Sequence, residues 1–156
     1  MPPVLRVRAA AAMRIARMDR QKFNEIVSND FFRCAPSEIL GNTRLFRLEH
    51  LVSLYILARL LEFGLPPRRA GALACEIVDA YRSGGTPEKR IVLAVGTSIS
   101  HVFRGSQYDF DHVEKDRIYA GLGTILFTLS FEIASILKMI DEGIEYERSI
   151  VGREED

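Results

Sequence analysis

Four polar or charged side chains stand at the start of a segment that we expect to be helical, about residues 19–28. They are Arg20, Gln21, Lys22 and Asn24. Asp19 can cap this helix, because its carboxylate accepts N–H groups that the first turn leaves unpaired. A helix in the major groove of DNA contacts bases from its N-terminal half, where arginine pairs with guanine and side-chain amides pair with adenine. The four side chains therefore suit a DNA-recognition helix, with Lys22 on a phosphate, although a solvated helix face often has the same composition.

A second group of side chains suits acid–base or metal chemistry. His101, Asp109, Asp111 and His112 lie close together in the sequence, and imidazole with carboxylate is a common ligand set for divalent metals. Their spacing matches no compact metal motif, and the chain has no H-E-x-x-H, G-x-S-x-G or P-loop sequence. The sequence therefore favours a binding protein over an enzyme, with no metal and no cofactor.

A net charge of zero conceals a gradient along the chain. Residues 1–90 carry a formal charge of +6, and residues 91–156 carry −6. A polyanion such as DNA would be attracted to the first region and repelled by the second. Chance segregation of charge on solvated surfaces gives the same totals, so this alternative stays open.

Membrane and compartment signals are weak. The longest uncharged stretch has 14 residues, fewer than the roughly 20 needed to cross a bilayer, so we expect no membrane span. Cys34 and Cys75 lack C-x-x-C spacing, which predicts reduced thiols in a cytoplasmic protein. Four arginines and no acid precede Asp19, which also suits an organellar targeting segment.

The elements that must position these side chains are mainly helical in the first half of the chain. Apolar residues recur at helical spacing from residue 47, and Gly64 followed by Pro66 ends that helix, because glycine caps it and proline cannot continue it. A further helix is expected at about residues 67–82. Shorter helices are expected at 9–17 and 19–28, and an irregular segment at 33–47 contains an extended stretch at 43–46.

The second half begins after a Gly-rich linker at residues 83–87 and predicts strands and one helix. Strands are expected at 91–95, 101–103 and 124–129. The helix, at about 132–148, carries an apolar stripe of Ile133, Ile136, Leu137, Ile140 and Ile144. This stripe suits a dimer interface, and it equally suits packing on the three strands of the same chain.

The fold class is therefore predicted as α+β, mainly α. We expect residues 1–82 to form one domain and residues 88–150 an α+β module for self-association or sensing. Residues 151–156 form a tail. The sequence names no small-molecule ligand for the second module.

Several segments of the first half resemble the MerR-like winged helix-turn-helix domain. They read MRIARMDRQKFN at 13–24, NTRLF at 42–46, LEHLVSL at 48–54 and LLEFGL at 60–65. In that family a two-helix unit precedes a wing commonly written GYRLY. The wing matches here at Arg44 and Leu45, while Asn42 and Thr43 replace the usual Gly-Tyr. The resemblance covers about residues 10–80, half of the chain.

The resemblance implies a DNA-binding transcriptional regulator. Arg44 corresponds to the wing arginine that approaches the phosphate backbone, and Arg47 lies close to it in sequence. Arginine suits this role because its planar fork of donors matches phosphate oxygens. Arg14 and Arg17 on the first helix are expected to add backbone contacts. One such domain covers about half a site, so we expect a homodimer on a pseudo-palindrome of double-stranded DNA. The alternative is a protein-interaction module, antitoxin-like or an adaptor, that uses the C-terminal helix without DNA.

Overall fold

The computed structural model describes residues 5–83, 89–108 and 123–151. The chain divides into two compact units, one of residues 1–75 with 136–156 and one of residues 76–135. The fold is α+β with small antiparallel sheets, as the sequence predicts. The division differs from the expected one, because most of the last helix groups with the N-terminal residues instead of with the three strands. The expected linker and tail lie almost entirely outside the described residues.

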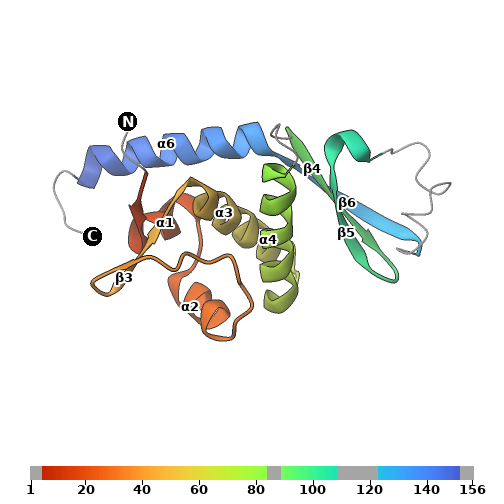
Figure 1. The fold of residues 1–156 in the computed structure, drawn as a ribbon, viewed down its shortest axis with the longest axis horizontal. Helices are drawn as coiled ribbons and strands as arrows, with labels where there is room; N and C mark the ends of the chain where they lie inside the picture. The colour runs from red at the N-terminus through yellow and green to blue at the C-terminus, as the bar shows by residue number, and fades with distance from the viewer. Residues whose placement is uncertain (1–4, 84–88, 109–122, 152–156) are drawn as a thin grey trace. The chain divides into compact units, whose positions relative to one another are not determined.

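The first unit contains the helices expected from the sequence and a small sheet (Figure 1). Its elements are β1 (Val7–Arg8), α1 (Ala9–Ala16), α2 (Arg20–Ser28), β2 (Ile39–Leu40), β3 (Thr43–Phe46), α3 (Leu48–Glu62), the first part of α4 (Pro67–Arg82) and most of α6 (Ile133–Val151). β3 lies between β1 and β2 in an antiparallel sheet. The extended stretch at 43–46 is thus confirmed, whereas its two-residue partner strands were not predicted.

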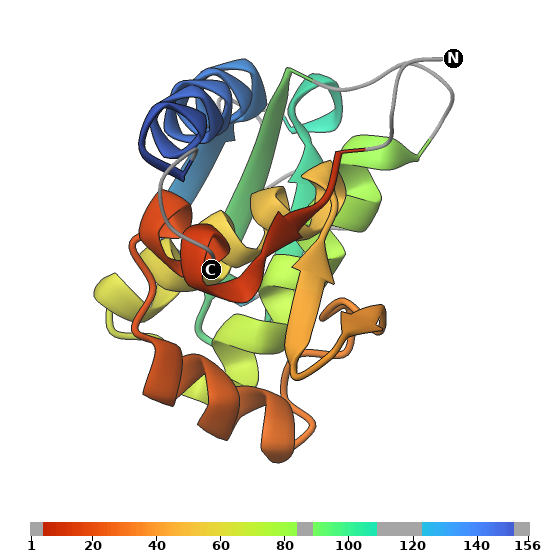
Figure 2. The same ribbon diagram turned by 90° about the vertical axis from the view of Figure 1, so that its left-hand side faces the viewer.

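Aromatic packing fixes α2 in this unit. Phe23 is buried, and its ring centroid lies 5.8 Å from that of Phe46 on β3 and 6.3 Å from that of Phe32 after α2. Ile26, one turn along α2, is also buried. One face of α2 is therefore held against the unit, and the opposite face is left to solvent. Figure 2 shows α2 and α6 on opposite sides of α1, as does Figure 1.

The second unit is built on three antiparallel strands, β4 (Arg90–Gly96), β5 (Ser100–Arg104) and β6 (Ile125–Glu132), with a short 3-10 helix η1 (Gly105–Gln107). All three strands were expected. β4 is central, with β5 and β6 on either side, and its residues 91–94 are all buried. A cluster of Val92, Ala94, Phe103 and Tyr108 forms the core on one face.

Two observations relate to the expectations on compartment. The expectation of two reduced thiols is wrong, because Cys34 and Cys75 form a disulfide with their Cα atoms 5.7 Å apart. The two residues lie 41 positions apart in sequence, and a separation of that length does not indicate that the two sulfur atoms lie close together in the fold. In the described part of the chain, no helix is long and apolar enough to cross a membrane.

Candidate nucleic-acid interface

The start of α2 has the geometry that the sequence predicts. The side chain of Asp19 accepts a hydrogen bond from the backbone N–H of Lys22 at 2.8 Å and so caps the helix. The predicted contact residues are all exposed. They are Arg20, Gln21, Lys22 and Asn24. Within the described ranges, none of these four side chains makes a hydrogen bond or an ion pair, so their donors and acceptors face solvent.

A hairpin made of β2, the turn Gly41-Asn42 and β3 lies near this helix start. Leu40 pairs with Thr43 and Ile39 with Arg44, so the turn has only two residues. Gly41 has φ +64°, a conformation typical of the first central residue of a tight hairpin turn and cheap only for glycine. The side-chain hydroxyl of Thr43 accepts a hydrogen bond from the N–H of Ala9 at 3.4 Å, which ties the hairpin to the start of α1.

An open groove of about 580 Å³ lies between the hairpin and the starts of α1 and α2. It is lined by Arg8, Ala10, Arg20, Leu40, Gly41, Asn42 and Thr43. Two of these residues are arginines and none is acidic. A groove with this charge attracts anions, and its arginines have the donor geometry that matches phosphate oxygens.

Arg44 and Arg47, the two arginines predicted to contact the phosphate backbone, both have partners within the chain. Arg44 donates from Nη1 to the backbone carbonyl of Pro36 at 2.8 Å. Arg47 lies 3.7 Å from the carboxylate of Glu38, which also pairs with Arg6 at 3.3 Å. These contacts hold β3 to the segment before β2, so both arginines have structural partners that the sequence did not reveal.

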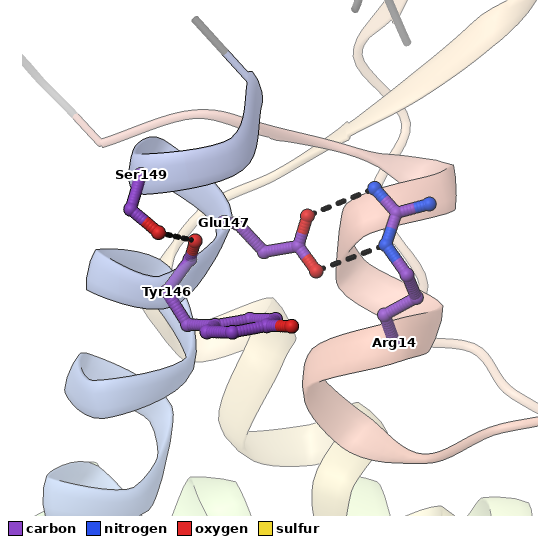
Figure 3. A network of polar contacts seen from close by, with 4 residues as sticks. All are labelled: Arg14, Tyr146, Glu147 and Ser149. Atoms are coloured by element: carbon purple, nitrogen blue, oxygen red, sulfur yellow. Dashed lines mark hydrogen bonds and ion pairs between the residues drawn. The ribbon is translucent and has the colours of Figure 1, made fainter. Parts of the chain in front are cut away.

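Arg14 on α1 pairs with a carboxylate of α6. Its Nε and Nη2 donate to the two carboxylate oxygens of Glu147 on α6 at 2.9 and 2.8 Å, as Figure 3 shows. The side chain of Glu147 is only 10% exposed, so losing its partner would leave a buried charge. Nε and Nη2 of Arg14 are therefore occupied by a carboxylate within the chain, and the phosphate contact of this side chain stays a prediction. Arg17, at the C-terminus of α1, is exposed.

The apolar stripe of α6 is buried within the single chain. Ile133, Ile136, Ile140 and Ile144 are at most 8% exposed, and Leu137 is partly buried. Gly143 on the same helix lies against Ile15 of α1. Of the two possibilities that the sequence left open, internal packing fits, but from Ile136 onward the stripe belongs to the first unit and not to the three strands.

Arg59 on α3 is a positioning residue that the sequence analysis missed. Its Nη2 donates to the carbonyls of Ala16 and Arg17, at 2.9 and 3.3 Å, at the end of α1. The guanidinium also lies 4.7 Å from the ring centroid of Tyr55. A cation at a helix C-terminus satisfies carbonyls that lack helical partners, so Arg59 fixes the turn between α1 and α2.

Of the four residues in the alternative acid–base or metal group, the structure describes only His101. His101 is exposed on β5, with its ring 4.5 Å from that of Phe103. Asp109, Asp111 and His112 lie outside the described residues. Among the residues that are described, no group of three His, Cys, Asp or Glu side chains is placed to hold a metal.

No protein-family model matches this chain, and no curated protein sequence matches it either.

Proposed function

We propose that the protein is a cytoplasmic DNA-binding transcriptional regulator of the MerR-like winged helix-turn-helix type, in which α2 is the recognition helix and the hairpin is the wing. One observation carries the proposal: the capped start of α2 presents unpartnered polar side chains beside a groove lined by two arginines. In this arrangement Gln21 and Asn24 contact bases. Arg20 and Lys22 take the phosphates that flank them.

The distribution of charge supports this side of the unit as the interface. The acidic residues Asp141, Glu142 and Glu145 are exposed on α6, which lies across α1 from α2 (Figures 1 and 2). A duplex bound at α2 is therefore kept away from these carboxylates. Residues 1–75, which carry a formal charge of +6, lie in the same unit as the acidic part of α6.

A homodimer on a pseudo-palindromic site remains part of the proposal, since one such domain covers about half a site. The stripe predicted as its interface is buried, so the dimer uses another surface. Sedimentation of the free protein and of its complex with a selected duplex measures the stoichiometry.

The test begins with selection of a binding site from a pool of random duplexes, followed by fluorescence anisotropy over a range of salt. The double variant Gln21→Ala/Asn24→Ala is expected to lose discrimination between the selected and a scrambled duplex, by roughly 1–3 kcal/mol per lost bidentate pair. Its salt dependence should stay unchanged, because no phosphate contact is removed.

Lys22 and Lys138 provide a matched pair for the phosphate contacts, since both are exposed lysines on helices of the first unit. Lys22→Ala should weaken binding to all duplexes and lower the salt slope by about one ion. Lys138→Ala, on α6, should leave both unchanged. Equal effects of the two substitutions, together with no effect of the Gln21/Asn24 double variant, would overturn the assignment of the interface to α2.

A second candidate function is a protein-interaction module that uses α6. Met139, Tyr146 and Ile150 are 43%, 65% and 39% exposed, and their spacing puts them on one face of the helix. An exposed apolar face of this kind is typical of a protein contact. This function takes the place of the first if the purified protein binds no duplex at low salt.

A further inference from the structure

The disulfide joins the segment after α2 to α4. Cys34 lies between α2 and β2, and Cys75 lies on α4. The closed loop contains the hairpin and all of α3. Both cysteine residues are partly exposed, so the disulfide does not lie in the fully buried core.

The segment that Cys34 anchors is also the base of the hairpin. Pro36, two residues further on, accepts the hydrogen bond from Arg44. The backbone carbonyl of Glu38 accepts a hydrogen bond from the N–H of Leu45 at 2.9 Å. The disulfide therefore determines where the first strand of the hairpin begins, and with it one wall of the arginine-lined groove.

A second contact holds the same segment to α4, and it does not depend on sulfur. A Cβ at Gly71, one turn before Cys75, would overlap the carbonyl oxygen of Phe31, so the two backbones are in close contact there. Phe32 is buried against Phe23. Reduction of the disulfide would thus free Cys34 from α4, while residues 31 and 32 stay in place and Pro36 and Glu38 keep their hydrogen bonds to β3.

We propose that the Cys34–Cys75 pair is a thiol–disulfide exchange site that regulates DNA binding at the α2–hairpin face, an inference that rests on the proposed function. A dithiol reductant attacks one sulfur, forms a mixed disulfide, and leaves as a cyclic or internal disulfide. The protein gains two electrons and two protons as two thiols. Disulfides in cytoplasmic proteins are commonly of this reversible type.

The oxidised protein is the form that binds DNA more tightly. The disulfide restricts residues 34–40 before binding, whereas in the reduced protein only the contacts with β3 hold this segment, so part of it must be ordered when the duplex binds. Ordering even one residue of backbone lowers affinity by about tenfold. We therefore expect reduction to weaken binding of the selected duplex by about tenfold or more.

The experiment compares the oxidised protein, the protein reduced with dithiothreitol, and the double variant Cys34→Ser/Cys75→Ser. Alkylation and mass measurement count the free thiols, and circular dichroism reports folding. Anisotropy gives the affinity for the selected duplex. Hydrogen exchange compares peptides of residues 35–46 with peptides of α3. The chain has two cysteines, so the double variant controls for every effect of dithiothreitol that does not involve them.

The proposal expects the reduced protein and the double variant to be folded and to bind about tenfold more weakly, with faster exchange at 35–46 and unchanged exchange in α3. The double variant should not respond to dithiothreitol. Equal affinity and exchange in both redox states would overturn the proposal, as would global unfolding on reduction, which would make the bond a structural staple. Absence of DNA binding in both states would overturn the proposed function, and the exchange at 35–46 would then decide alone whether the bond releases the hairpin.

Discussion

Two faces of the first unit use the same kinds of side chain in opposite ways. On the face between α1 and α6, here called the closed face, Arg14 is held by both oxygens of Glu147, and the isoleucines of α6 are buried. On the face formed by α2 and the hairpin, here called the open face, Arg20 is exposed beside an open groove. An arginine on a basic segment therefore indicates a nucleic-acid contact only after its partners inside the chain are known.

The largest expected loss of stability follows from a substitution in the closed face. Ile140→Asp places a charge at a position that is 0% exposed and should lower the free energy of unfolding by about 4 kcal/mol or more. Met139→Asp, at the neighbouring exposed position, is the control and should change stability by less than about 1 kcal/mol. Thermal and urea denaturation measure both. A folded monomer from a parent dimer would instead show that the stripe is a dimer interface.

A smaller effect is expected where α4 supports the open face. Gly71→Ala forces the added methyl group against the Phe31 carbonyl, and the backbone shift should cost about 1–3 kcal/mol. It should also weaken DNA binding, because the segment below the hairpin moves. Ala72→Ser, on the exposed side of α4, should leave both quantities unchanged. Normal stability of Gly71→Ala in urea denaturation would contradict the close approach of the two backbones.

The ion pair of the closed face should contribute less than the isoleucine core. Arg14→Ala leaves the Glu147 carboxylate without its partner, but Arg14 itself is half exposed, so we expect a loss of about 1–2 kcal/mol. Arg148→Ala removes an arginine from a pair with Glu145 that is exposed on both sides and should cost at most about 0.5 kcal/mol. Equal losses in urea denaturation would place the two pairs in the same environment.

The smallest effect on stability is expected on the open face. Gln21→Ala/Asn24→Ala removes no contact within the described part of the chain and should change the free energy of unfolding by less than about 0.5 kcal/mol. A loss of DNA discrimination in this stable variant would separate recognition from folding. A large loss of stability would show instead that Asn24 serves helix packing.

The sequence predicts those parts of the fold that depend on local pattern. The helices follow from apolar spacing, and the end of α3 follows from Gly64, which has φ +91°. The cap by Asp19 is likewise a local effect and is confirmed. The exposed side of α2 follows from the burial of Phe23, because residues next to a buried position on a helix turn away from it.

The rest depends on contacts between distant residues. β1 and β2 have two residues each, too few to show an alternating pattern, and they exist because β3 pairs with both. Glu147 lies 133 positions from Arg14 and Arg59 lies 43 from Ala16, so neither partner has a sequence signal. The disulfide was missed for the same reason. These long-range contacts decide which arginines remain available to a ligand.

Arg17 occupies the left-handed conformation between α1 and α2, with φ 54°. An L-residue with a side chain holds this conformation at a cost of about 1 kcal/mol relative to glycine. Arg17→Gly would relieve that strain and at the same time remove an exposed positive charge from the turn that leads into α2. Its effects on stability and on DNA affinity should therefore have opposite signs. A selection for thermal stability alone would favour glycine here, whereas a selection for binding would retain the arginine.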